Sequence, residues 1–168
     1  MEQFVRDCRI SLIYEGTNGI QALDLVGRKL ASNGGRAIFS FFADVDAFLG
    51  ENGDDEALKP FIDGLSDAKA KLQDGTTWLM QNGMSNFDNA GASSHDFLHL
   101  FGLTALAFMW AKMAKVSLEK KDQGDPIYEE KLMTGQYFLD RMLPDAAAHL
   151  VKVKSGSKSM MAMPADQF

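Results

Sequence analysis

The sequence contains little cysteine, no cluster of basic charge and no long uninterrupted apolar run. Its single cysteine, Cys8, excludes an intramolecular disulfide and favours a reducing compartment. The 17 Lys and Arg residues are scattered among 23 Asp and Glu residues, and the net charge of −6 argues against nucleic acid as a partner. We therefore expect an acidic, cytoplasmic protein that binds no nucleic acid.

Neither a secretion signal nor a membrane span is predicted. The first residues include Glu2 and Asp7 instead of the apolar core of a signal peptide. The longest apolar run, Phe97 to Ala111, is interrupted by His99 and Thr104 and is shorter than the roughly 20 residues that a membrane span requires. We expect this run to form a helix buried within a helical bundle.

Apolar residues recur at helical spacing along most of the chain, and no segment alternates as a strand does. The spacing predicts helices over about 2–12 and 19–30, followed by four long helices over about 36–50, 56–82, 94–121 and 126–153. Short polar turns join the long segments, which is typical of an all-α, up-and-down bundle preceded by a helix-turn-helix.

Glycine, asparagine and proline mark the expected breaks between these helices. Asn33-Gly34-Gly35 predicts the left-handed backbone that stops a helix, and either Thr17 or Asn18 is expected to cap the helix near residue 19. The polar stretch 82–94 is expected to be a turn. Pro144 is expected to kink the last helix, because its ring removes a hydrogen bond.

One carboxylate, Glu15, lies in the break between the first two predicted helices. A glutamate beside apolar groups is suited to act as a general base, because it reaches farther than an aspartate and burial raises its pKa towards working pH. Gly16 permits a close approach by a planar ring, and Thr17 offers a hydroxyl to a cofactor. Spacing alone favours a solvated loop glutamate, because glutamates are nearly always exposed.

The segment from Arg6 to Arg28, with Ile-Tyr-Glu-Gly-Thr at its centre and Ile20-Gln21 after it, resembles the catalytic-base segment of flavin-dependent acyl-CoA dehydrogenases. The resemblance implies that Glu15 is the catalytic base and that Tyr14, Gly16 and Thr17 lie against FAD. Two positions depart from the family pattern. Gly19 replaces a glutamine common in the family, and Cys8 replaces a small alanine.

The chain from about Arg36 to Phe168 resembles the extra C-terminal helical domain of a larger bacterial subgroup of these enzymes. The resemblance is carried by Phe-Gly-Leu-Thr-Ala-Leu at 101–106, by the stretch 141–150 and by the ending 161–168. It implies three parts: residues 1–33 as the end of the enzyme's C-terminal α domain, 36–153 as an accessory four-helix bundle, and 154–168 as a tail.

The resemblance also implies an activity, the α,β-dehydrogenation of acyl-CoA thioesters, with an electron-transfer flavoprotein as acceptor. This chain alone is then expected to be inactive and to bind no FAD, because it lacks most of the flavin pocket. The alternative is a non-catalytic helical module for interaction or oligomerisation. In either case we expect a homo-oligomer, because residues 1–33 would expose an apolar face.

Two further groups of residues are candidates for binding sites. His95 and His99 have the spacing of a helical zinc motif, but only His149 remains as a third histidine, so we expect hydrogen bonding and packing and no metal. Arg28 and Lys29 are compatible with contact to a CoA phosphate or with a solvated helix end.

Overall fold

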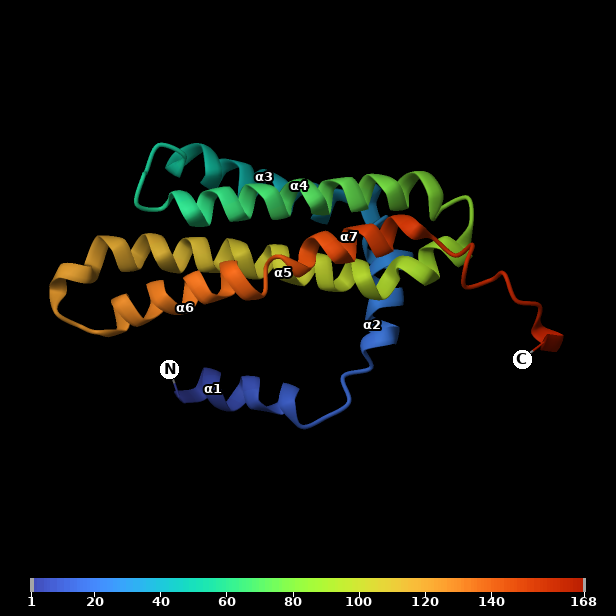
Figure 1. The fold of residues 1–168 in the computed structure, drawn as a ribbon, viewed down its shortest axis with the longest axis horizontal. Helices are drawn as coiled ribbons and strands as arrows, with labels where there is room; N and C mark the ends of the chain where they lie inside the picture. Colours follow the sequence, from blue (N-terminus) through green and yellow to red (C-terminus); the bar gives the residue numbers. More distant parts are fainter. Residues whose placement is uncertain (1, 168) are drawn as a thin grey trace.

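The computed structural model describes residues 2–167 as helices joined by short turns, with no β-strand in that range (Figure 1). The α-helices are α1 (Glu2–Arg9), α2 (Asn18–Asp24), α3 (Arg36–Asn52), α4 (Lys59–Asn82), α5 (Phe87–Lys120), α6 (Ile127–Arg141) and α7 (Asp145–Ser155). Shorter helical turns are η1 (Ile10–Leu12), η2 (Leu25–Lys29), η3 (Ser32–Gly35), η4 (Lys121–Gln123) and η5 (Ala165–Gln167). The predicted all-α class is confirmed.

Helix α5 is the central element of the bundle, about 50 Å long at the usual helical rise. Helix α4 packs along it, while α6 and α7 run one after the other along its two halves (Figure 1). Helix α3 packs on α4, and η3 joins it to the helical stretch that precedes the bundle. The order is therefore up-and-down, as the alternation of long helices and short turns predicted.

The bundle buries two apolar clusters, one towards each end. The predicted apolar stripe, which begins just before α4 and continues along it, is buried: Leu58, Phe61, Ile62, Leu65, Leu72 and Leu79. One cluster joins Phe61 and Leu65 of this stripe to Phe108 of α5 and Phe138 of α6. The other joins Leu72 and Leu79 to Phe97 and Leu100 of α5 and to α7. Leu30, which directly follows η2, belongs to the second cluster, so the helical stretch before α3 also contributes to the core around α5.

The expected single helix over 126–153 is two helices, so the prediction of a mere kink was wrong. The backbone N–H of Met142 donates to the carbonyl of Phe138 at 3.0 Å, and that of Leu143 donates to the same carbonyl at 2.9 Å, a wider π-type bond with which α6 ends. Pro144 has no N–H to continue the pattern, and α7 starts directly after it. The break allows the last part of the chain to follow both halves of α5.

The expected turn over 82–94 is much shorter, because α5 already begins at Phe87. The side chain of Asn86 accepts the backbone N–H of Asp88 at 3.0 Å and caps the helix. Polar residues are tolerated in the first turns because their hydroxyls are satisfied: Ser93 Oγ donates to the Val153 carbonyl at 2.7 Å and Ser94 Oγ to that of Gly91 at 2.8 Å. The polar composition of residues 87–94 therefore does not mark a turn, because these residues form the first turns of α5.

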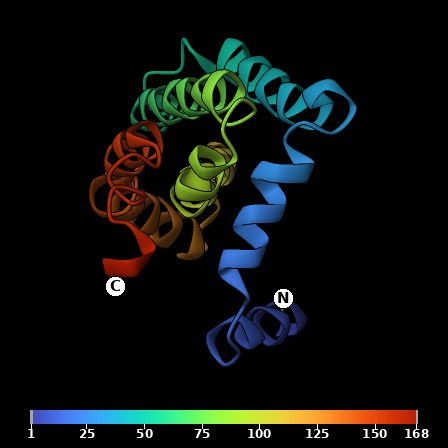
Figure 2. The ribbon, with the colours of Figure 1, turned by 90° about the vertical axis from the view of Figure 1, so that its right-hand side faces the viewer.

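The N-terminal segment, which we define as residues 2–24, leads away from the bundle (Figure 2). Helix α2 contacts α5 and has one buried residue, Ala22, whereas α1 has no buried residue. Asn33, Gly34 and Gly35 adopt positive φ angles of 51°, 68° and 79°, which confirms the predicted left-handed stop before α3. The segment is thus attached to the bundle at one end and largely solvent-exposed at the other.

By length and composition alone, one helix of the described residues, Phe87–Gln123, is long and apolar enough to cross a membrane. This helix covers α5 and η4 and extends well beyond the apolar run from Phe97 to Ala111, which by itself is too short for a span. Buried helices of other bundles pass the same test. In this fold α4, α6 and α7 pack on α5, and its buried Thr104 hydroxyl donates to the carbonyl of Leu100 at 2.9 Å. These contacts favour the role of a core helix.

Candidate active-site loop

Glu15 lies on the loop between η1 and α2, and its side chain is exposed. The loop begins where the carbonyl of Ile10 accepts the N–H of Ile13 at 3.0 Å and that of Tyr14 at 3.3 Å, which ends the first helical stretch. It ends at Asn18, the first residue of α2. The predicted break between the two helices is confirmed, and the role of Glu15 as a base stays a prediction.

Gly16 sits where a side chain would crowd the loop. A Cβ atom added there would come 2.8 Å from Oδ1 of Asn18 and 3.8 Å from the ring of Tyr14. The absence of a side chain lets the ring of Tyr14 and the amide of Asn18 approach the backbone from two sides. The close approach inferred for this position from the sequence therefore has a geometric basis in the loop itself.

Thr17 occupies the position before α2 but does not cap it with its side chain, so the expected side-chain cap is absent. Its backbone is left-handed, with φ 49° and ψ 39°, an uncommon conformation for a β-branched residue. Its carbonyl accepts the N–H of Gln21 at 3.0 Å, whereas its hydroxyl makes no cap bond. A hydroxyl not used for capping is available to another group.

Exposed apolar side chains flank Glu15 in the sequence. Leu12 is 87% exposed, Ile13 77% and Tyr14 56%, and Phe4 and Ile20 are exposed on the helices to either side. Isolated apolar side chains on a surface are ordinary, but a group on one short segment is typical of a contact face. The loop can therefore supply an apolar wall once another body covers it.

The two basic residues after α2 are occupied by an ion pair. Nε of Arg28 lies 2.5 Å from Oδ1 of Asp24, and Nζ of Lys29 lies 3.2 Å from Oδ2 of the same carboxylate. The hydrogen bond from Arg28 holds the pKa of Asp24 at about 2. Of the two readings for Arg28 and Lys29, the solvated helix end is the one that this geometry favours.

All three histidines meet where α7 packs on α5. The rings of His95 and His99 are 4.5 Å apart, those of His99 and His149 are 5.2 Å apart, and Nδ1 of His149 lies 2.7 Å from Oδ1 of Asp96. Burial, together with the nearby His95 and His149, lowers the pKa of His99. Within residues 2–167, no group of three or more His, Cys, Asp or Glu side chains is arranged to hold a metal ion.

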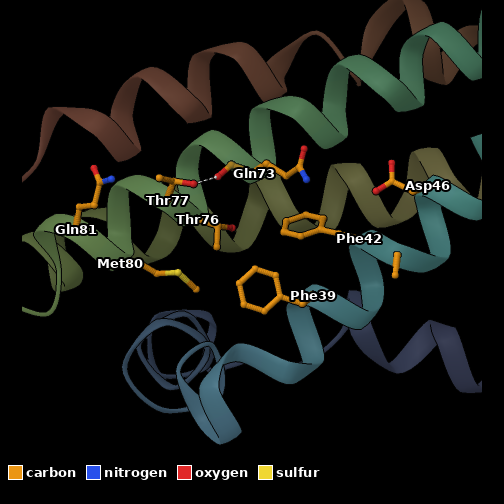
Figure 3. Close-up of a pocket in the computed structure, with 9 residues that line it drawn as sticks. Phe39, Phe42, Asp46, Gln73, Thr76, Thr77, Met80 and Gln81 are labelled. Atoms are coloured by element: carbon orange, nitrogen blue, oxygen red, sulfur yellow. Dashed lines mark hydrogen bonds between the residues drawn. The ribbon is translucent and has the colours of Figure 1, made fainter.

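Among the cavities of the bundle are two that none of the predicted site residues lines. A groove of about 500 Å³ between α3 and α4 has Phe39 and Phe42 facing Met80, with polar side chains such as Gln73 and Thr77 along its edge (Figure 3). A second cavity of about 440 Å³ lies between η2–η3 and the turn that joins α4 to α5. Neither cavity was predicted from the sequence.

Residues 41–164 match the family described as "Acetyl-CoA dehydrogenase C-terminal like". The chain belongs to this family. The predicted membership in a C-terminal region of acyl-CoA dehydrogenases is therefore confirmed. The match starts after the candidate loop, so it does not bear on the role of Glu15.

Individual relatives extend the similarity of this acyl-CoA dehydrogenase region to almost the whole chain. A 3-methylmercaptopropionyl-CoA dehydrogenase of Ruegeria pomeroyi is 31% identical over 95% of this chain. A broad-specificity linear acyl-CoA dehydrogenase of Mycobacterium tuberculosis is 26% identical over 86%, and a butyryl-CoA dehydrogenase of Syntrophomonas wolfei is 24% identical over 99%. The chain spans only 25 to 28% of the length of these relatives.

Proposed function

We propose that this chain is the C-terminal part of an FAD-dependent acyl-CoA dehydrogenase in which Glu15 is the catalytic base. One observation carries the proposal: Glu15 stands on an exposed loop walled by Ile13 and Tyr14, in a chain whose similarity to acyl-CoA dehydrogenases extends beyond the bundle into this segment. The substrate class is an acyl-CoA thioester, and an electron-transfer flavoprotein is the proposed electron acceptor.

In the proposed reaction the carboxylate of Glu15 removes a proton from the carbon α to the thioester carbonyl. The electron pair of that C–H bond forms the α,β double bond as a hydride leaves the β carbon, which gives the trans-2-enoyl-CoA. FAD, when bound, accepts this hydride. Apolar neighbours favour the neutral form of a buried carboxyl, so covering the loop would make Glu15 a stronger base.

The loop has features that suit a flavin. The missing side chain at Gly16 leaves the backbone open to a planar ring, the hydroxyl of Thr17 makes no cap bond, and the ring of Tyr14 is half exposed. We propose that these three residues contact FAD in the complete enzyme. Because they form only one wall, this chain alone is proposed to bind no FAD and to be inactive.

The test uses the complete enzyme, with this chain joined to its upstream region, in wild-type form and as Glu15→Gln. Glutamine keeps the shape of the side chain but cannot accept the α proton, so acyl-CoA is expected to bleach bound FAD in the wild type and not in the variant. The matched control is Glu51→Gln on α3, where the carboxylate is also exposed. Undiminished bleaching in Glu15→Gln, with FAD still bound, would place the base elsewhere.

A second function, that of a non-catalytic module for helical interaction, is favoured by the exposed side chains of Phe4, Leu12 and Ile13. We propose that this face causes the isolated chain to self-associate. Light scattering is expected to give a dimer or larger species for the wild type and a monomer for the double variant Leu12→Ser, Ile13→Ser. A wild-type monomer over a wide concentration range would contradict this.

A further inference from the structure

The cavity beside η2 has a lining of one chemical kind. Its walls carry apolar side chains and glycines and no charged group: the larger side chains are Val26, Leu30, Leu79, Met80, Met84 and Phe87. Its volume of about 440 Å³ is within the range of small-molecule sites in proteins. A cavity without a charged lining residue does not suit the phosphates of a nucleotide, but it does suit a hydrocarbon.

The backbone around this cavity is irregular in two places. In η2 the N–H of Leu30 donates to the carbonyl of Leu25 at 2.8 Å, a π-type bond one residue wider than in an α-helix, and such turns often occur at functional sites. The wall is continued by Gly34 and Gly35, both at positive φ. The two glycines leave this part of the wall without side chains.

A line of apolar residues connects the cavity with the loop of Glu15. Ile20, Leu23, Gly27 and Ala31 follow one another at spacings of three and four residues, which places them along one side of α2 and its continuation. All four residues are exposed, and Gly27 and Ala31 also line the cavity. The path along the helix from Asn18 to Gly27 is roughly 13 Å at the helical rise.

We propose that the cavity receives the far end of the linear alkyl chain of a long acyl-CoA whose thioester end lies at Glu15. This inference rests on the proposed function, since it assigns the cavity to the same substrate. A short acyl group cannot span the distance from the loop to Gly27, whereas a long one can. The cavity is then a determinant of chain-length preference that is supplied by η2, η3 and the bundle, and not by the loop.

Gly27 is the position at which to test the assignment, because a Cβ atom added there meets no atom within 4 Å. Gly27→Leu adds a side chain at the cavity wall, and Gly102→Leu on α5 is the matched control, since its added Cβ also meets nothing within 4 Å and lies outside the cavity. Equal melting temperatures for the two variants would show that both fold.

In the complete enzyme, we compare kcat/KM for palmitoyl-CoA with kcat/KM for butyryl-CoA. Gly27→Leu is expected to lower the ratio of these two values by about tenfold or more, the usual discrimination when part of an apolar pocket is filled. Gly102→Leu is expected to leave the ratio unchanged. An unchanged ratio in Gly27→Leu, or a wild-type enzyme that oxidises only short acyl-CoAs, would overturn the proposal.

Binding is tested separately from catalysis, with palmitate as the probe and the methyl NMR signals of methionine as the readout. In the 168-residue chain, palmitate is expected to shift the signals of Met80 and Met84 but not that of Met133, which lies outside the cavity. Gly27→Leu is expected to abolish the shifts, and butyrate to cause none. Uniform shifts of all methionines, or no shift, would overturn the proposal.

The same palmitate titration in the complete enzyme shows whether a protein segment, and not an alkyl chain, occupies the cavity. If palmitate shifts Met80 and Met84 in the chain but not in the complete enzyme, a protein segment fills the cavity there, and the proposal is wrong. If the shifts persist while the enzyme dehydrogenates no acyl-CoA, the proposed function fails while the alkyl-binding site remains. The two failures are therefore distinguishable.

Discussion

The bundle and the N-terminal segment belong to one chain but bury their apolar side chains to very different degrees. In the bundle, Phe97, Leu65 and Leu72 are completely buried around α5. In the N-terminal segment only Ala22 is buried, although the segment carries the candidate base. The bundle can therefore be stable by itself, whereas the loop of Glu15 needs another surface to become a closed site.

The largest expected effect comes from removing one phenylalanine ring in each region. Phe97→Ala should lower the free energy of unfolding by about 3–5 kcal/mol, because it leaves a cavity in the core. Phe4→Ala, at a side chain that is 71% exposed, should change it by less than about 0.5 kcal/mol. Urea unfolding followed by circular dichroism measures both. Equal losses would mean that the N-terminal segment is part of the core.

Within the bundle, two glycines offer a sharper contrast. A Cβ atom at Gly135 of α6 would come 2.7 Å from the ring of Phe61, so Gly135→Ala should destabilise the bundle by about 1–3 kcal/mol. At Gly102 the added atom meets nothing, so Gly102→Ala should stabilise α5 by up to about 1 kcal/mol. Thermal unfolding of both variants shows whether each substitution lowers or raises the stability. A Gly135→Ala variant as stable as the wild type would contradict the tight packing of α6 on α4.

A buried hydrogen bond holds the start of α5 to the end of α7. Ser93 Oγ donates to the carbonyl of Val153 at 2.7 Å, so Ser93→Ala should cost about 1–2 kcal/mol by leaving that carbonyl without its donor. Ser155→Ala, an exposed serine on the same helix end, is the control and should cost much less. If the two variants unfold at the same urea concentration, the bond does not secure α7.

The smallest expected effect is a dependence on pH. The pKa of His99 in the folded chain is below its ordinary value of 6.5, because of burial and of His95 and His149, although Asp96 opposes the shift and Lys152 adds to it. The unfolded chain therefore binds the proton more readily, and stability present above pH 6.5 is lost as the pH falls through the folded pKa.

The measurement is urea unfolding at several pH values between 8 and roughly 5, the range in which histidine titrates. The wild type should lose more stability on acidification than His99→Gln, which keeps a polar side chain but does not titrate. An equal loss in both would assign the dependence to other groups. The comparison belongs to the bundle alone, because none of these histidines lies in the N-terminal segment.

Much of the bundle could be predicted because apolar spacing reflects burial directly. The stripe of α4 from Leu58 to Leu79 is buried as its spacing predicted, and Asn33-Gly34-Gly35 stops a helix with the expected left-handed backbone. Polar residues were less informative. Ser93 and Ser94 suggested a turn, yet both lie inside α5, because hydrogen-bond partners from distant or preceding residues satisfy their hydroxyls.

The candidate site was predictable only as a set of residues. The order of Tyr14, Glu15, Gly16 and Thr17 resembles a catalytic-base segment and so indicates a catalytic role. No pattern in the neighbouring sequence indicates which surface covers the loop. The cavity beside η2 was missed because it is formed by residues from three parts of the chain, including Gly27, Met80 and Phe87, which only the fold brings together. The small residues at 27, 31, 34 and 35 were the one available signal.

Hydrogen exchange tests most directly whether the N-terminal segment is completed by another part of the enzyme. The amides of residues 2–24 and of the bundle are followed in the 168-residue chain and in the complete enzyme. We predict slow exchange in the bundle in both, and exchange in the N-terminal segment that is fast in the chain alone and slow in the complete enzyme. Equal protection of residues 2–24 in the two samples would contradict the account.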